Sequence, residues 1–308
     1  MSEPTTNVED SNLGLDPSSV PQYSFLGDLL DLTKPGLSRL VLVTAAGGVW
    51  LADASMNVWR AIGTVVLTAM VVGGANALNN YIERDTDRLM ERTRNRPLPA
   101  GRLDPRYALA MGGALAFIAV PGLVYIANPL SALLAAVAFV LYVLVYTPMK
   151  RKSSLNTLVG AIPGAMPPLI GWTAATGTID FAGMLLFGLL FLWQIPHSLA
   201  ITLFRKEDYA NAGLIVYPVE FGDQATRHQI LLFCLPLIVL PWLLIQQDVG
   251  GVLTMSVGTL LGVVFAWKAW QGVRKQLDAV WARKLFLFSL VYLLAFFVVL
   301  TVDQLITI

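Results

Sequence analysis

Apolar residues in this chain of 308 residues form long blocks separated by short polar segments. A helix needs roughly 17 to 25 apolar residues to cross a bilayer, and about nine blocks reach that length. The sequence therefore predicts an all-α fold, a polytopic membrane bundle of about nine transmembrane helices. The predicted helices span residues 36–52, 58–80, 107–126, 129–148, 156–176, 181–203, 229–246, 250–270 and 285–303.

Composition and charge agree with a membrane protein. Only 13% of the residues are charged, against roughly a quarter in soluble domains. If the first helix starts inside, the inner segments and their helix ends hold every Lys and Arg except Arg60. Because positive residues concentrate on the cytoplasmic side, we expect a cytoplasmic N-terminus and a C-terminus outside.

The amino-terminal segment differs from the rest of the chain. Residues 1–22 are polar and rich in Pro and Ser, so we predict a disordered cytoplasmic tail, followed by one membrane domain over residues 23–308. This segment has no apolar signal core and no Arg-rich transit pattern, which favours the cell membrane of a bacterium or archaeon over an organelle. The single Cys234 rules out a disulfide framework.

One polar segment, residues 79–102, directly follows an apolar block and gathers acidic and basic side chains. Asn79, Glu83 and Asp87 are spaced four residues apart, so on a helix they lie on one face, with Asp85 pointing elsewhere. Oxygen-bearing side chains suit Mg²⁺, which binds carboxylates and commonly keeps substrate phosphates as further ligands. The spacing therefore indicates a site for a hard cation.

Arginines follow these acids at positions 92, 94, 96 and 102. The planar guanidinium group matches phosphate oxygens, so the segment predicts a pocket for a phosphorylated substrate at the inner membrane surface. The alternative is an ordinary cytoplasmic loop, basic because of topology and acidic through local charge pairing. That alternative does not account for the acids on one face at the end of an apolar helix.

A second segment, residues 192–213, also runs from an apolar helix into a loop of mixed charge. Pro196 is expected to kink this helix. A histidine inside a membrane indicates a ligand, a proton carrier or a substrate contact, although a neutral imidazole bonded between helices is the alternative. Five residues of the segment lie close to one helical face: Gln194, His197, Ile201, Arg205 and Asp208.

The third polar loop, residues 146–156, carries Lys150 and precedes a helix with three prolines. Pro163, Pro167 and Pro168 would break a regular helix, which a bilayer tolerates where the freed carbonyls are buried or line a cavity. We therefore predict a cavity wall here. Close helix packing through Gly160 and Gly164 is an equally good interpretation of the same segment.

The segment NNYIERDTDRLMERTRNRPLPAG resembles the signature of the UbiA-like intramembrane prenyltransferases, whose fold is a helix bundle around a central cavity. The signature positions are Asn79, Glu83, Asp87, Arg92 with Thr93, Arg96 and Gly101. Five more segments are similar to the branch of this superfamily that farnesylates heme b: LTKPGLSRLVLVTAAGG, YTPMKRKSSLNTLVGAIPGAMPPLIGW, WQIPHS, EDYANAG and GDQATRHQI. The resemblance extends over about residues 30 to 305.

The chain departs from the family pattern at a few positions. Glu83 stands where the family usually has Asp, Thr86 replaces an aliphatic residue, and Ser198 replaces a Phe after the histidine. The segment GLIVYP also differs from the usual sequence. None of these changes removes a candidate metal ligand.

The resemblance implies transfer of a farnesyl group from farnesyl diphosphate to a vinyl group of heme b, giving heme O. It implies Mg²⁺ as cofactor and His197 as the heme contact, in the role of an axial ligand to iron. The implied partners are both substrates, membrane lipid, and a heme A synthase or terminal oxidase that receives the product, without nucleic acid. The implied catalytic metal ligands are Asn79, Glu83, Asp87 and Asp208, and the implied diphosphate-binding residues are Arg92, Arg96, Lys150 and Lys206.

Three other functions are weighed against this one. A sister prenyltransferase would make a quinone or chlorophyll precursor, but such enzymes usually carry more Asp than the run Arg205, Lys206, Glu207 and Asp208. A secondary transporter would also contain broken helices, yet charged groups gathered on one side argue against alternating access. A purely structural subunit would leave the acidic helix face without a purpose.

Overall fold

The computed structural model describes residues 24–52 and 56–307, and the predicted disordered tail, residues 1–22, lies outside the described residues. Every regular element in the described part is helical. The short elements are α1 (Phe25–Leu32), α6 (Thr147–Met149), α9 (Lys206–Asn211) and a π-helical turn, η2 (Leu141–Tyr146). The longer helices are α2 (Pro35–Leu51), α3 (Val58–Asp87), α4 (Pro105–Ile126), α5 (Pro129–Val140), α7 (Asn156–Thr176), α8 (Phe181–Phe204), α10 (Tyr217–Cys234), α11 (Pro236–Ile245), α12 (Val252–Lys275) and α13 (Ala279–Thr307).

The membrane-bundle prediction is confirmed. Eight helical segments of the described chain are long and apolar enough to cross a bilayer, and α2, with 17 residues, is a shorter apolar helix beside them. Two of the eight combine several elements, because α5, η2 and α6 run together, as do α10 and α11. About nine helices therefore describe the bundle, as the apolar blocks predict.

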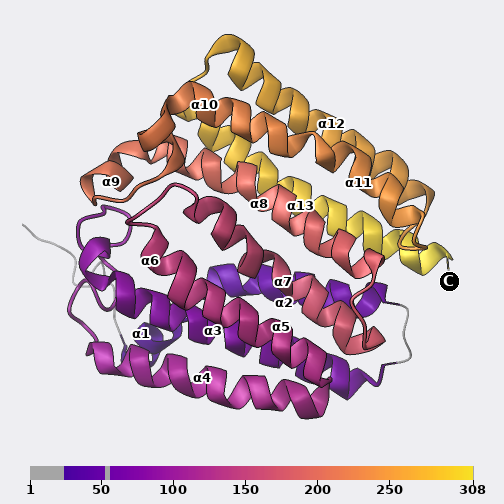
Figure 1. The fold of residues 1–308 in the computed structure, drawn as a ribbon, viewed down its shortest axis with the longest axis horizontal. Helices are drawn as coiled ribbons and strands as arrows, with labels where there is room; N and C mark the ends of the chain where they lie inside the picture. The colour runs from indigo at the N-terminus through magenta and orange to yellow at the C-terminus, as the bar shows by residue number, and fades with distance from the viewer. Residues whose placement is uncertain (1–23, 53–55, 308) are drawn as a thin grey trace, which may run out of the picture.

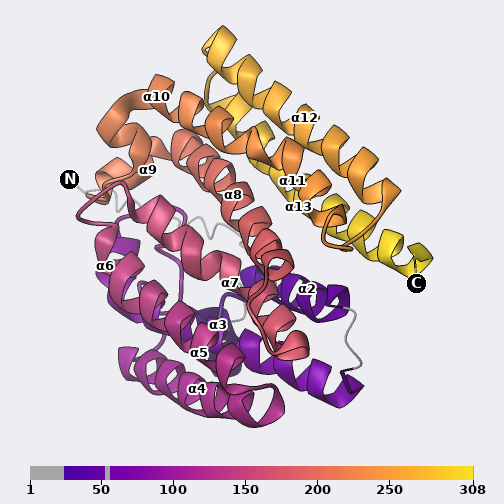
Figure 2. The same cartoon turned by 45° about the vertical axis from the view of Figure 1, so that its right-hand side comes forward.

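The helices form a bundle in which α7 occupies a central position. It packs against α2, α8 and α5, and Figure 2 shows it between these helices. In Figure 1 the helices α3, α4 and α5 lie on one side and α10, α11 and α12 on the other. The elements α1, α6 and α9 gather at one end of the bundle, opposite the end that holds the C-terminus. We call the end with α1, α6 and α9 the inner end, because the three polar loops meet there.

Two helix boundaries differ from the predicted ones in a way that matters for the site. α3 continues past residue 80 to Asp87, so Asn79, Glu83 and Asp87 belong to one continuous helix. α10 begins at Tyr217 instead of near residue 229, with a bend at Gly222, where φ is +82°. Hydropathy misses both extensions because the residues of these turns are polar.

The prediction that three prolines break α7 was wrong. Pro163, Pro167 and Pro168 lie within one helix that runs from Asn156 to Thr176. The Gln194 side chain of α8 donates a hydrogen bond to the Ala161 carbonyl oxygen at 2.6 Å, a polar contact between neighbouring helices of the kind common in membrane bundles.

Glycines allow α7 to approach its neighbours closely. A Cβ atom on Gly171 would overlap the backbone of Ala45 on α2, and one on Gly160 would overlap the ring of Tyr146. Gly164 in the same way leaves room for the Gln194 amide. Close packing and a cavity wall, the two interpretations of this segment, are therefore both correct, because residues of the same helix also line the cavity described below.

Arg60, the one positive residue away from the inner end, has a structural role. Its Nε and Nη2 atoms donate hydrogen bonds at 2.9 Å to the carbonyl oxygens of Ile126 and Ala127. These carbonyls lie at the C-terminal end of α4, so they accept no hydrogen bond from an N–H of the same helix. A cation at a helix C-terminus also stabilises the helix dipole, which explains a positive charge on this side.

Candidate active site

A cavity of about 450 Å³ lies among α2, α3, α5, α7 and α8. Its polar lining includes Asn76, Tyr142, Tyr146 and Lys150, with Gln194 and Ser198 on α8. The remaining wall is mainly apolar and also contains His197 from α8. The cavity therefore joins a polar region near the inner end to an apolar region deeper in the bundle, which is the arrangement expected for a ligand with a charged head and a hydrophobic body.

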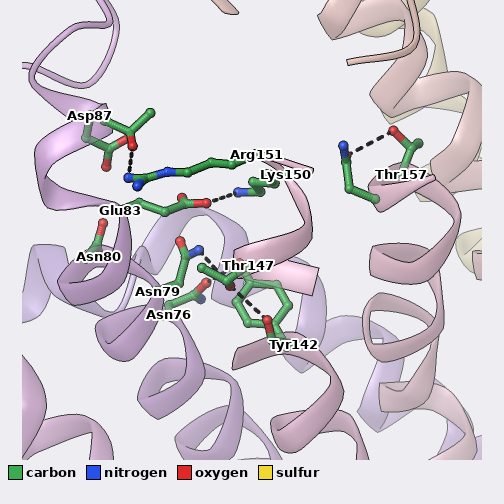
Figure 3. Close-up of polar contacts among 12 residues, drawn as sticks. Asn76, Asn79, Asn80, Glu83, Asp87, Tyr142, Thr147, Lys150, Arg151 and Thr157 are labelled. Carbon is green, nitrogen blue, oxygen red and sulfur yellow. Dashed lines mark hydrogen bonds and ion pairs between the residues drawn. The ribbon is translucent and has the colours of Figure 1, made fainter. Parts of the chain in front are cut away.

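The inner end of α3 presents three oxygen-bearing side chains, each held by a cation from another part of the chain. Lys34 donates to Asn79 Oδ1 at 2.6 Å, Lys150 Nζ lies 2.7 Å from Glu83 Oε1, and Arg96 Nη1 lies 2.8 Å from Asp87 Oδ2. Figure 3 shows Glu83 and Lys150 pointing toward each other across the site. The structure thus confirms that the three α3 residues share a face.

Burial and neighbouring charge set the protonation of the two lysines. Burial, together with the charge of Arg96, lowers the pKa of Lys34 to about 7. Burial also disfavours the charged form of Lys150, but the Glu83 carboxylate overcomes it and holds the pKa of Lys150 well above its ordinary value. Lys150 is therefore a permanent cation at neutral pH, whereas Lys34 can gain or lose a proton there.

A π-helical turn places further polar groups beside α3. Within η2 and α6, both the N–H and the hydroxyl of Thr147 bond to the Tyr142 carbonyl oxygen, and Thr147 Oγ1 accepts from Asn79 Nδ2 at 3.0 Å. The Tyr142 hydroxyl donates to Asn76 Oδ1 at 3.2 Å. Such π-turns often occur at functional sites, and this one brings two tyrosines to the cavity wall.

Several residues of this site were not predicted from the sequence. Lys34 is the first positive residue of the chain and directly precedes Pro35. These two features are the only ones in the sequence that could have pointed to it. The Arg151 guanidinium donates a hydrogen bond to Thr86 Oγ1, and Asn80 Nδ2 donates one to the Leu32 carbonyl oxygen at 2.9 Å. Contacts of this kind join segments far apart in the chain, so spacing alone does not reveal them.

Two predicted site residues lie in a different pocket. Asp208 and Lys206, on α9, line a polar pocket of about 700 Å³ at the inner end. Asp208 Oδ1 accepts from the Glu91 N–H at 2.9 Å, whereas its buried Oδ2 has no hydrogen bond within the described chain. Lys206 pairs with Asp223 at 2.7 Å. Arg92, the remaining predicted phosphate contact, is exposed on the loop between α3 and α4.

The oxygen donors nevertheless suit a hard cation. Among the described residues no three His, Cys, Asp or Glu side chains form a cluster able to hold a metal, so the donors are not gathered into one ligand set. Asn79, Glu83 and Asp87 contact cationic side chains instead of each other. Each of the three oxygen donors is paired with a protein cation. A metal ion could take the place of these cations at the donors while the cations pair with an anion bound to the metal, so that no charge would be left uncompensated.

His197 lies in the apolar part of the same cavity. Its Nδ1 is 2.7 Å from Ser289 Oγ of α13. Its ring stacks on that of Trp193 and is tilted against that of Phe286, with both centroid distances at 4.8 Å. The structure therefore brings His197 and Lys150, which come from different polar segments, to the lining of one cavity.

Comparison with known sequences identifies the family. The profile of the UbiA prenyltransferase family matches residues 41–291. A protoheme IX farnesyltransferase of Myxococcus xanthus is 49% identical over 277 residues, which cover 90% of this chain and 94% of that protein. A protein of the same description from an Anaeromyxobacter species is 50% identical over 92% of this chain and 95% of its own.

Solved structures support the same fold. A digeranylgeranylglyceryl phosphate synthase has a TM-score of 0.77 at 14% identity and covers 91% of this chain and 98% of its own. A UbiA homolog from Archaeoglobus fulgidus, bound to GPP and Mg²⁺, has a TM-score of 0.64 at 17% identity over 89% of this chain and 99% of its own. At these identities the likeness establishes the fold alone.

The buried pair of Glu83 and Lys150 generates a stability prediction. Glu83→Gln should destabilise the protein by about 3 kcal/mol, because it leaves Lys150 buried without a counter-charge. Adding Lys150→Met should recover part of that loss, since the unpaired charge is removed. Unfolding in mixed micelles with increasing SDS measures all three proteins.

Asp85→Asn is the matched control for that experiment. Asp85 belongs to the same helix, but its side chain is 66% exposed and lies 3.7 Å from Arg84, so its loss should change stability by less than about 0.5 kcal/mol. Equal losses for Glu83→Gln and Asp85→Asn would contradict the structural importance of the buried pair.

Proposed function

Because this chain belongs to the UbiA prenyltransferase family, we propose that it transfers a farnesyl group from farnesyl diphosphate to a vinyl group of heme b, giving heme O and diphosphate. Its relatives at 45–50% identity over most of the chain are described as protoheme IX farnesyltransferases. One structural observation carries the proposal: a single cavity combines a cationic polar end at Lys150 with an apolar part that contains His197.

The polar end suits the diphosphate. Lys34, Lys150 and Arg96 already pair with oxygen donors of α3, and the same cations can pair with diphosphate oxygens. Each cation that does so frees a donor for the metal. Arg92 on the loop between α3 and α4 and Lys206 on α9 complete the proposed diphosphate contacts.

The proposed ligands of Mg²⁺ are Asn79, Glu83, Asp87 and Asp208. Asp208 joins this set because its buried Oδ2 has no hydrogen bond in the described chain and because its neighbour Tyr209 lines the cavity. When bound to these oxygens, Mg²⁺ would supply electrostatic stabilisation of the departing diphosphate.

The reaction breaks the bond between the allylic carbon and the diphosphate oxygen, and the electron pair leaves with diphosphate. Lys150 stays protonated and stabilises this negative charge. The π electrons of the vinyl group then form the new carbon–carbon bond, and water adds to the resulting cation and loses a proton. The apolar cavity wall keeps water from the farnesyl cation before it meets the vinyl group.

His197 is the proposed heme contact, as a ligand to the iron. It lies in the apolar part of the cavity, whereas the diphosphate contacts lie at the polar end. This separation would hold the porphyrin deeper in the bundle than the diphosphate, with the prenyl chain between them. We also propose that a heme A synthase or a terminal oxidase receives the product.

Turnover provides the test of the reaction. Purified protein in detergent, incubated with farnesyl diphosphate, heme b and Mg²⁺, should yield a porphyrin whose mass has increased by a farnesyl group and a hydroxyl group. A chelator should abolish this product. Unmodified heme, together with prenylation of a quinone precursor, would instead assign the chain to a sister activity of the same family.

The metal ligands are tested by a charge-preserving change at Glu83 and by charge-removing changes at Glu83 and Asp87. Glu83→Asp, which keeps the carboxylate usual in the family, should retain magnesium-dependent turnover. Glu83→Gln and Asp87→Asn should each lower kcat by about 100-fold or more, as expected when a group that stabilises the transition state is lost. Undiminished turnover of either amide variant would remove that residue from the metal site.

We further propose that the protein lies in the cell membrane with its N-terminus in the cytoplasm and its C-terminus outside. The support is that nearly all positive residues belong to inner segments and that Arg60, the exception, caps a helix. An alkaline phosphatase fused after residue 308 should be active and a fluorescent protein fused there should be dark. The reverse result would invert the topology.

A further inference from the structure

His197 receives a hydrogen-bonded environment that its proposed contact with heme does not by itself explain. Its Nδ1 lies 2.7 Å from the hydroxyl oxygen of Ser289. That hydroxyl in turn donates to the carbonyl oxygen of Phe286, one turn earlier in α13, at 2.6 Å. Ser289 is fully buried, so both contacts are shielded from water.

Counting the hydrogens of this chain of bonds determines the tautomer of the histidine. A serine hydroxyl has one hydrogen, and a carbonyl oxygen can only accept. The Ser289 hydrogen is therefore used on Phe286, and the hydroxyl oxygen must accept from His197. This requires a hydrogen on Nδ1, and in a neutral imidazole the Nε2 atom then carries a free lone pair.

The rings around His197 determine which edge of the imidazole is left open. Trp193 stacks on one face and Phe286 lies against the ring as well, at 4.8 Å each. Trp193 is itself held, because its Nε1 donates to the Ser289 backbone carbonyl at 2.6 Å. With one face stacked on Trp193 and Nδ1 engaged by Ser289, Nε2 is the ring nitrogen of His197 left to face the cavity that this residue lines.

We propose that Ser289 is a positioning residue that keeps His197 in the Nδ1-protonated tautomer, so that the Nε2 lone pair faces the cavity as a ligand for the metal of a metalloporphyrin. Metal-binding histidines usually donate their second ring N–H to a neighbouring acceptor, which sets the tautomer and the ring orientation. The ligand role rests on the proposed function, whereas the tautomer follows from the protein alone.

The tautomer can be measured without any substrate. The chain contains two histidines, so after His228→Gln the ¹⁵N spectrum of histidine-labelled protein reports on His197 alone. We expect the Nδ1-protonated form, and we expect Ser289→Ala to shift the population toward the Nε2-protonated form. Nε2 protonation in the protein with Ser289 intact, or an unchanged tautomer in Ser289→Ala, would overturn the proposal.

The ligand role is tested with ferric heme b as the probe. Ser289→Ala should weaken heme binding by about 10- to 100-fold, the usual effect of losing such an outer partner, and should move the absorption spectrum toward that of His197→Ala. Ser131→Ala is the matched control, because Ser131 is equally buried but bonds to Thr173 at 2.8 Å in another part of the bundle. It should leave affinity and spectrum unchanged.

The outcomes distinguish the heme contact of His197 from the positioning role of Ser289. If His197→Ala keeps the heme spectrum of the unmodified protein, the heme contact in the proposed function fails, and the ligand role of Ser289 fails with it. If His197→Ala changes the spectrum but Ser289→Ala does not, the heme contact survives and the positioning role is wrong. Similar losses in Ser289→Ala and Ser131→Ala would show a general packing defect and would also overturn it.

Discussion

Buried charge at the inner end of α3 is the constraint on which the rest of this structure depends. Lys34 and Lys150 are partly buried, and removing an ammonium group from water is costly unless it gains a partner. Each therefore contacts an oxygen of α3, at Asn79 and Glu83. Because the cations come from separate loops, meeting this requirement brings the start of α2 and the end of α6 to the same helix.

The charged pairs lie beside a cavity whose wall is formed in part by the closely packed helix α7. α7 uses glycines to approach α2, Tyr146 and Gln194 closely, and its prolines stay within a continuous helix. The apolar wall that results keeps the dielectric low, so the Glu83 carboxylate has a large effect on Lys150. The pairing that keeps these buried charges stable thus also keeps Lys150 protonated at the cavity, and perturbed groups of this kind are common at functional sites.

The polar loops differ in how well the sequence predicts them. The face formed by Asn79, Glu83 and Asp87 could be predicted because α3 continues as a regular helix to Asp87. The continuation of the α8 face to Asp208 could not, because the chain leaves helical geometry at Arg205, where ψ is +18°, and starts a new short helix. Asp208 consequently lines a second pocket. Extending the helical face of His197 along the sequence therefore does not predict the position of Asp208.

The sequence by itself determined the membrane bundle, its count of about nine helices, the acidic face of α3 and the family, because apolar length, helical period and signature motifs are local properties. Only the tertiary structure decided which cation meets which oxygen, that Lys34 contacts Asn79, and that Ser289 lies beside His197. Ser289 is 92 residues from His197 in the chain. Contacts over such separations depend on how helices pack, and the packing of side chains is not encoded in any single stretch of residues.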